Sequence, residues 1–246
     1  MNTNNALLVV PAFNEEKRLH PTNFLRLCRE NELDILFIDD GSTDQTVEIL
    51  KSLSSTSPNI KFLSLEYNSG KSNAIWFGFR NGAELGYRYV GFVDSDSSCC
   101  NNDIINGLGL ILSDPDLSVV SGARVLLAGS NIQRSNFRKW ISRIMATVLS
   151  IITKTDFYDP QSPCKWYRVD DQFKAVLGKN PQTKWFGELE LVINLIRLRP
   201  LRSFPLKIQE FALSEWSEVA NSKLTILHFP SVIKQLYTLL RISRVQ

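Results

Sequence analysis

The sequence predicts an α/β protein with a mostly parallel, twisted sheet flanked by helices. Through the first 120 residues, short apolar runs alternate with stretches of helical periodicity. Polar clusters rich in carboxylates stand where the apolar runs end. The chain has 246 residues, 43% of them hydrophobic, which is enough for a sizeable core. Strand–helix alternation of this kind implies right-handed βαβ units and a parallel sheet.

Five short apolar runs in the first half are expected to be the strands of this sheet. They are Ala6–Pro11, Asp34–Ile38, Ile60–Leu65, Tyr89–Val93 and Leu117–Ser121. The amphipathic stretches between them predict helices at Thr22–Glu30, Thr43–Leu53, Lys71–Leu85 and Asn102–Leu112. Ser42 or Thr43 is expected to cap the second of these helices, and Gly70 to form the turn that opens the third.

The second half is less regular. Arg134–Thr153 predicts a helix with a basic start and an apolar end, and Asp156–Tyr167 a loop with two prolines. Phe186–Leu198 predicts a helix, Phe204–Phe211 a strand, and Thr225–Arg244 a C-terminal amphipathic helix. No repeat or linker divides the sequence. We therefore expect one domain over residues 1–246, with a ligand-binding half at 1–120 and a second half at 121–246.

The charge of the chain is divided unevenly between these halves. The net charge of +3 combines −7 over residues 1–120, with 9 basic and 16 acidic residues, and +10 over residues 121–246, with 19 and 9. Ser121–Thr155 holds six basic residues and no acidic one. Such a division suggests two ligand tasks in one molecule.

Carboxylates follow two of the predicted strands. Asp94 and Asp96 come directly after Val90–Val93, and Asp39 and Asp40 follow the second strand. In open parallel sheets, ligands bind beyond the carboxyl ends of the strands. Two carboxylates at such a position can hold Mg²⁺ or Mn²⁺, which commonly also takes phosphate oxygens from a substrate. A surface turn with solvated aspartates is the alternative interpretation of each pair.

Other common sites are not supported. Asn68–Ser72 lacks the first glycine of a nucleotide-hydrolase phosphate loop, since Leu65 stands there, although Lys71 remains available to a phosphate or sugar. Pro11 and Phe13 occupy the first βα turn, where a dinucleotide fingerprint needs glycines. Four cysteines without a C-x-x-C pair and two histidines make a zinc site improbable and favour free thiols.

The stretch Ser121–Thr155, in which all charged residues are basic, suggests an anionic partner, and a solvated basic helix face is the alternative interpretation. Arginine side chains in it suit the two-pronged binding of phosphate. The apolar run Ile144–Ile152 that follows favours an anionic membrane surface over nucleic acid. No apolar run approaches the length of about 20 residues that spans a bilayer, and no signal peptide is recognised. A cytoplasmic protein, peripheral on the inner face of the membrane, is expected.

Taken together, the motifs resemble glycosyltransferase family 2, with the GT-A fold. The similarity rests on VVPAFNEEKRL at Val9–Leu19, IDDGSTDQT at Ile38–Thr46, NSGKSNAI at Asn68–Ile75 and FVDSDSS at Phe92–Ser98. In the second half, SGAR at Ser121–Arg124, RSNFR at Arg134–Arg138, DPQSPCKWY at Asp159–Tyr167 and WFGELELV at Trp185–Val192 resemble the branch of dolichyl-phosphate mannose and glucose synthases. So does the segment from Trp216 to Leu224.

This resemblance implies roles for individual residues. Pro11, Phe13, Glu15, Asp40 and Lys71 would bind the nucleotide sugar with Asp94, and Asp94 and Asp96 would hold the metal. Arg124, Arg138 and Lys223 would bind the acceptor phosphate, while Gln161 and Lys165 would line the same cleft. The chain departs from the branch pattern at Asn221, at Glu188 and around Gln161.

The resemblance implies metal-dependent transfer of a sugar, with inversion, from a UDP- or GDP-linked donor to a polyprenyl phosphate. An anionic acceptor needs positioning more than a general base. The catalytic candidates are Asp96, Arg124, Gln161, Glu188 and Glu190. One alternative is a family member that acts on a hydroxyl of a glycan or lipid-linked saccharide, with Glu188 or Glu190 as base. Another is a non-catalytic nucleotide-sugar-binding protein with a decayed site.

Overall fold

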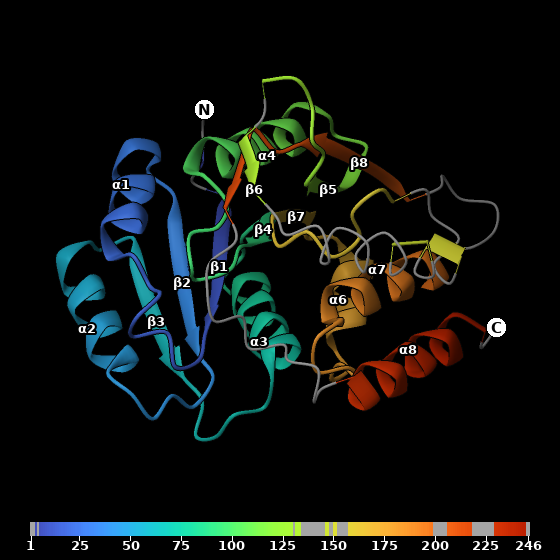
Figure 1. The fold of residues 1–246 in the computed structure, drawn as a ribbon, viewed down its shortest axis with the longest axis horizontal. Coiled ribbons are helices and arrows are strands. Elements are labelled where there is room, and N and C mark those ends of the chain that lie inside the picture. Colours follow the sequence, from blue (N-terminus) through green and yellow to red (C-terminus); the bar gives the residue numbers. More distant parts are fainter. Residues whose placement is uncertain are drawn as a thin grey trace.

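The computed structural model describes residues 3, 5–129, 131–133, 146–147, 150–151, 157–198, 206–217 and 229–244. Its centre is a seven-stranded sheet in the order β3-β2-β1-β4-β7-β5-β8 (Figure 1). The strands of this sheet are β1 Ala6–Ala12, β2 Asp34–Asp39, β3 Ile60–Ser64, β4 Tyr89–Phe92, β5 Leu117–Ala123, β7 Lys165–Arg168 and β8 Lys207–Ala212. Neighbouring strands run parallel except at β7, which is antiparallel to both β4 and β5. The mostly parallel α/β fold predicted from the sequence is confirmed.

Helices cover both faces of the sheet, as the apolar strands require. They are α1 Pro21–Asn31, α2 Thr46–Thr56, α3 Lys71–Glu84, α4 Asn101–Ser113, α6 Asp171–Leu177, α7 Gly187–Leu198 and α8 Phe229–Arg244. Side chains of α1, α2 and α4 form one core with the sheet, and those of α3, α6 and α7 form the other. A third, smaller cluster joins α7 to α8, and α8 lies at the opposite end of the molecule from α1 and α2 (Figure 1).

The first half follows the sequence prediction closely. Its five strands and four helices begin and end within a few residues of the predicted bounds. The predicted cap of α2 is wrong, because the helix begins at Thr46 and neither Ser42 nor Thr43 caps it. Ser42 Oγ instead accepts a hydrogen bond from the Asn14 N–H at 2.9 Å, so it ties the loop after β2 to the loop after β1.

The second half contains elements that the sequence did not indicate. The predicted loop Asp156–Tyr167 ends in β7, which enters the centre of the sheet, and α6 follows it. Two three-residue strands, β6 Asn131–Gln133 and β9 Glu215–Ser217, form a separate small sheet. Most of the predicted helix Arg134–Thr153 lies outside the described residues, although residues 146–147 and 150–151 are helical. The C-terminal amphipathic helix is present as α8.

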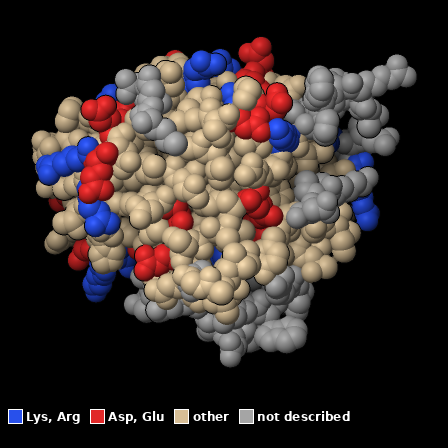
Figure 2. Space-filling model, turned by 90° about the horizontal axis from the view of Figure 1, so that it is seen from above, with Lys and Arg blue, Asp and Glu red and all other residues tan. Residues whose placement is uncertain are grey.

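Within the described ranges, no helix has the length and apolar character needed to cross a membrane. All four cysteines are free thiols, as expected. Seen from above the view of Figure 1, most of the visible surface is uncharged. Basic and acidic side chains are mixed around its rim, and a few scattered acidic side chains lie within the face (Figure 2). The charge division of the sequence therefore produces no patch of one sign among the described residues on that face.

Candidate active site

The carboxyl ends of β1 and β2 carry two loops that hold each other. The N–H of Glu15 donates to Thr46 Oγ1 at 2.8 Å, and the N–H of Thr43 donates to Asn14 Oδ1 at 2.8 Å. Gly41 has φ of +72°, and a Cβ there would lie 2.7 Å from the backbone N of Asn68. Glycine therefore lets the loop after β3 pass directly over the loop after β2.

Asp40 fixes the loop that precedes α3. Its Oδ1 accepts hydrogen bonds from the Ser69 N–H at 2.8 Å and the Ser69 hydroxyl at 2.9 Å, and its Oδ2 accepts from the Gly70 N–H at 2.8 Å. Asp40 is 3% exposed. The carboxylate predicted to bind the nucleotide thus also shapes the backbone just before Lys71.

Two cations neutralise the carboxylates of Asp94 and Asp96, which together form the D-x-D motif of residues 94–96. Lys71 Nζ, at the start of α3, lies 2.6 Å from Asp94 Oδ1. Arg18, from the loop after β1, bonds Asp96 through its guanidinium and lies 3.5 Å from Glu15 Oε2. Burial disfavours the charged ammonium, but the carboxylates of Asp94, Glu188 and Asp96 outweigh it and raise the pKa of Lys71. The structure therefore brings together four of the predicted donor residues and adds Arg18.

A second lysine lies behind this pair. Lys165 opens β7 directly opposite Phe92 and is 1% exposed. The Phe92 ring has Lys71 Nζ 5.6 Å and Lys165 Nζ 5.7 Å from its centroid. Burial lowers the pKa of Lys165 to about 8, although Glu188 and Asp159 favour its charged form. Its ammonium also donates to the carbonyl oxygen of Ser162.

Arg124 is bound to Asp159 by two parallel hydrogen bonds. Its Nε lies 2.6 Å from Asp159 Oδ2, and its Nη2 lies 2.8 Å from Oδ1 and 3.2 Å from the carbonyl oxygen of Gln161. The guanidinium also stacks 5.0 Å from the ring centroid of Trp216. Burial opposes ionisation of Asp159, but Arg124 outweighs it and lowers the pKa of this carboxyl. Arg124 therefore positions the loop that contains Gln161.

Glu188 and Glu190 differ although both start α7. Glu190 accepts hydrogen bonds from the backbone N–H of Gln182 at 2.9 Å and from the N–H and hydroxyl of Thr183 at 3.0 Å. Burial raises the pKa of Glu190, against these hydrogen bonds. Glu188 is 4% exposed, and its Oε2 is buried without a hydrogen-bond partner among the described residues. Glu190 therefore fixes the loop at Gln182 and Thr183, whereas Oε2 of Glu188 is available to accept a hydrogen bond or a proton from a ligand.

The remaining predicted residues have different outcomes. Pro11 is buried at the end of β1, Phe13 is half-buried in the loop after it, and Gln161 is half-buried beside Arg124. Arg138 and Lys223 lie outside the described residues, so their assignment to the acceptor phosphate stays a prediction.

Arg18 and Asp159 were not singled out from the sequence. A signal existed for Asp159, because it is among the first acidic residues after a long base-only stretch. Across the described parts of the chain, no three His, Cys, Asp or Glu side chains gather closely enough to hold a metal alone.

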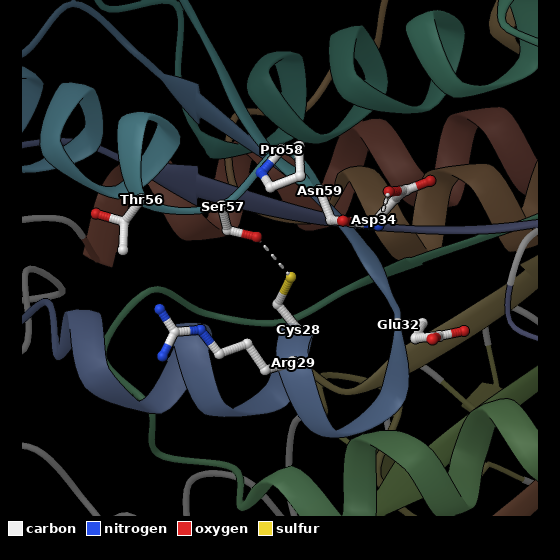
Figure 3. Close-up of a pocket in the computed structure, with 8 residues that line it drawn as sticks. All are labelled: Cys28, Arg29, Glu32, Asp34, Thr56, Ser57, Pro58 and Asn59. Atoms are coloured by element: carbon white, nitrogen blue, oxygen red, sulfur yellow. Dashed lines mark hydrogen bonds between the residues drawn. The ribbon is translucent and has the colours of Figure 1, made fainter.

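A hollow of about 600 Å³ lies elsewhere, where α1 and α2 end and β2 begins (Figure 3). Its lining includes Cys28, whose sulfur lies 3.3 Å from Ser57 Oγ, together with Arg29, Glu32 and Asp34. This is the amino end of the parallel strands, and none of the predicted site residues lines it. The candidate active site is therefore at the opposite edge of the sheet.

Comparison with known proteins identifies the family of this chain. The family model for glycosyl transferase family 2 matches residues 7–172. A dolichyl-phosphate beta-glucosyltransferase of Trichomonas vaginalis, ALG5A, is 26% identical, with 96% of this chain and 72% of the relative aligned. The dolichyl-phosphate beta-glucosyltransferase of Saccharomyces cerevisiae is 23% identical, with 89% and 69% aligned.

The fold also resembles that of a solved enzyme. Glucosyl-3-phosphoglycerate synthase of Mycobacterium tuberculosis, in a structure with Mn²⁺ and UDP-glucose, superposes with a TM-score of 0.70 at 18% identity, covering 98% of this chain and 80% of that one. The family match spans the loops and strand ends that carry Asp40, Lys71, Asp94 and Asp96. This chain belongs to glycosyl transferase family 2 and is a glycosyltransferase with a GT-A-like fold.

Proposed function

We propose that this glycosyltransferase transfers a sugar from a nucleotide sugar to a polyprenyl phosphate, depends on Mg²⁺ or Mn²⁺, and inverts the anomeric carbon. The observation that carries the donor half is the pairing of both D-x-D carboxylates with cations, Lys71 with Asp94 and Arg18 with Asp96. A divalent ion bound to a diphosphate could replace both partners in each ion pair, because the metal is a cation for the carboxylate and the diphosphate is an anion for the lysine or arginine. The carboxylates would turn to the ion, and Lys71 and Arg18 to the diphosphate oxygens.

The residues fit a hard divalent cation. Asp94 and Asp96 offer carboxylate oxygens, the ligands that Mg²⁺ and Mn²⁺ prefer, and both side chains are partly exposed, at 30% and 12%. With fewer than three carboxylates at hand, such an ion takes further ligands from substrate and water. When bound, it would neutralise charge on the leaving nucleoside diphosphate. The Mycobacterium tuberculosis enzyme that shares the fold was solved with Mn²⁺ and UDP-glucose, in keeping with this assignment.

The acceptor half is supported by the dolichyl-phosphate beta-glucosyltransferases, which align with most of this chain. Because these relatives are named as glucosyltransferases, glucose is the first sugar to test, and UDP-glucose is the first donor. A phosphate acceptor is already anionic at neutral pH, so the protein has to orient its oxygen in line with the leaving group. Arg124, Arg138 and Lys223 are the proposed phosphate ligands. For Arg124, phosphate would replace one of its two hydrogen bonds to Asp159.

A polyprenyl substrate implies contact with a membrane surface, and α8 offers one suitable face. Its apolar stripe packs against α7, so that stripe is not free for lipid, contrary to the simplest interpretation of an amphipathic helix. The outward face carries Ile233 and Tyr237, 53% and 69% exposed, beside the exposed Lys234, Arg241 and Arg244. No acidic residue lies in α8. This combination suits an anionic lipid surface, and a peripheral position on the inner face of the membrane is proposed.

One observation favours a second candidate, transfer to a hydroxyl group. Such an acceptor requires a general base, and the buried Oε2 of Glu188 has no hydrogen-bond partner among the described residues. Glu190 is the weaker candidate, because its carboxylate already accepts the Gln182 and Thr183 hydrogen bonds.

The test is transfer of radiolabelled sugar into lipid. The protein is mixed with UDP-glucose or GDP-mannose, Mn²⁺, and vesicles that contain undecaprenyl or dolichyl phosphate, with hydroxyl acceptors in parallel reactions. We expect a lipid-phosphate sugar with one donor, and loss of the product in Asp96→Asn while the exposed Asp116→Asn retains it. Transfer only to a hydroxyl acceptor would replace the proposed acceptor, and full activity of Asp96→Asn would remove Asp96 from the metal site.

A further inference from the structure

The inward face of α8 is apolar except at one position. Val232, Leu236, Leu239 and Ile242 pack on Phe186, Leu189 and Ile193. Gln235 lies on the same face and is only 7% exposed. Burying an amide costs free energy unless its donors and acceptor are all paired. A glutamine at this position therefore needs a partner that an apolar side chain could not serve.

Both ends of the Gln235 amide are paired. Oε1 accepts from the backbone N–H of Lys184 at 2.8 Å and of Trp185 at 2.9 Å. Nε2 donates to the carbonyl oxygen of Ser231 at 3.3 Å and to its hydroxyl at 3.2 Å. Gln235 thus holds the segment of residues 182–187, which we call the α7 entry loop, at the point just before α7 begins.

The other side of the α7 entry loop faces the start of α3. The N–H of Ser72 donates to the carbonyl oxygen of Lys184 at 3.0 Å, and the N–H of Gly187 donates to Ser72 Oγ at 2.8 Å. A Cβ on Gly187 would lie 2.5 Å from Ser72 Cβ, so the approach needs glycine. Ser72 adjoins Lys71, which neutralises Asp94. Two successive sets of hydrogen bonds therefore connect Gln235 to Lys71: the first joins Gln235 to the α7 entry loop, and the second joins that loop to Ser72, the neighbour of Lys71.

We infer that Gln235 is a positioning residue for the donor site: through the α7 entry loop it fixes the first turn of α3, and with it the place of Lys71. The inference rests on the proposed binding of a nucleotide sugar at Lys71, Asp94 and Asp96. It also makes α8 part of the donor site's support, although none of its described side chains is assigned to the substrate.

The test compares three variants of the whole protein. Gln235→Leu keeps the volume and apolar packing but leaves the two N–H groups unpaired. Gln235→Glu keeps an oxygen that can accept both of them. Thr238→Ala is the matched control, because this residue lies on α8 and, among the described residues, its hydroxyl donates only to the helix carbonyl of Lys234. Affinity for UDP-glucose or UDP with Mn²⁺ is measured by calorimetry without any lipid, together with amide hydrogen exchange.

We expect Gln235→Leu to weaken nucleotide binding about ten-fold, since unpaired buried donors loosen the loop. Its amides at Lys184, Trp185 and Ser72 should exchange faster, while Gln235→Glu and Thr238→Ala stay within about two-fold of the wild type in affinity. Unchanged affinity of folded Gln235→Leu would overturn the inference, and so would an equal loss in Gln235→Glu. If the wild type binds no nucleotide, the proposed function fails, and unchanged exchange at Ser72 in Gln235→Leu would then overturn the inference separately.

Discussion

Lys71 Nζ lies 2.6 Å from Asp94 Oδ1, so the first residue of α3 neutralises the first carboxylate of the D-x-D motif. The two residues are 23 positions apart in the sequence, Lys71 at the start of α3 and Asp94 in the loop after β4, and the partly exposed pair stands at the carboxyl edge of the sheet. A divalent cation has to compete with Lys71 for Asp94, whereas a metal-bound diphosphate provides Lys71 with a new anionic partner. Metal and nucleotide should therefore bind this site cooperatively.

Replacing Lys71 should separate these two effects. We expect Lys71→Gln to bind Mn²⁺ alone about five-fold more tightly, because a competing cation is gone. The same variant should bind the nucleotide sugar about ten-fold or more weakly, because a charge-assisted hydrogen bond to diphosphate is lost. Electron paramagnetic resonance of free Mn²⁺ and calorimetry measure the two affinities, with the exposed Lys61→Gln as control. Weaker binding of Mn²⁺ alone would contradict the competition.

The two glutamates of α7 should respond differently to substitution. Glu190→Leu leaves the Gln182 and Thr183 donors unpaired, so we expect unfolding free energy to fall by about 2 kcal/mol. Glu188→Gln should change turnover with a lipid-phosphate acceptor less than about ten-fold, because that reaction needs no general base. Denaturant unfolding measures the effect of Glu190→Leu, and the rate of sugar transfer from one nucleotide sugar measures the effect of Glu188→Gln. A loss of more than about a hundred-fold in Glu188→Gln would indicate a base and favour the hydroxyl acceptor.

The Arg124–Asp159 pair should be important for stability. Asp159→Asn removes one charge from a pair whose side chains are 12% and 9% exposed, leaving Arg124 without its carboxylate. We expect a loss of about 3 kcal/mol in unfolding free energy, measured by urea denaturation. Lys207→Met, which breaks the exposed Lys207–Asp114 pair, is the control and should cost much less. Equal effects of the two substitutions would show that Arg124 is not held through Asp159.

Lys165 should make stability depend on pH. Its folded-state pKa of about 8 is below the value of about 10.4 in an unfolded chain. Between these values the unfolded chain binds more protons, so the contribution of Lys165 to unfolding free energy rises with pH. The charged lysine is disfavoured below pH 8, and this penalty is relieved as the pH approaches 10.

Relative to Lys165→Met, we therefore expect the wild type to gain about 2 kcal/mol between pH 7 and 9.5. Urea unfolding of both proteins at several pH values isolates this effect, because all other titrating groups are shared. A difference that is constant with pH would show that Lys165 keeps an ordinary pKa in the folded protein.

The first half of the fold was predictable because most of its strands, β1, β2, β4 and β5, are buried on both faces by helices. Such strands are short continuous apolar runs, as in Val9–Val10 and Phe37–Ile38, and their local pattern is sufficient to identify them. The polar residues that follow them necessarily meet at one edge of a parallel sheet. Asp40, Asp94 and Lys71 were found for this reason, and the motif resemblance gave them their expected roles.

Strand β7 could not be predicted in the same way. Its four residues begin with Lys165, end with Arg168 and follow two prolines, which is a loop pattern. They form a strand because β4 and β5 pair with them from both sides. Helix α6 left a weak local signal, since Asp170 accepts from the Phe173 N–H as an N-cap.

By itself, the sequence determined the family, the parallel α/β architecture and the carboxylates at the strand ends, because local periodicity and short motifs encode them. The tertiary structure decided the partners: Arg18 on Asp96, Arg124 on Asp159, Glu190 on its loop, and Gln235 beneath the start of α7. Glu188 and Glu190 are two residues apart, so their side chains leave α7 in different directions. Which of them meets a loop and which keeps an unpaired oxygen depends on contacts between distant segments, and no local pattern records those.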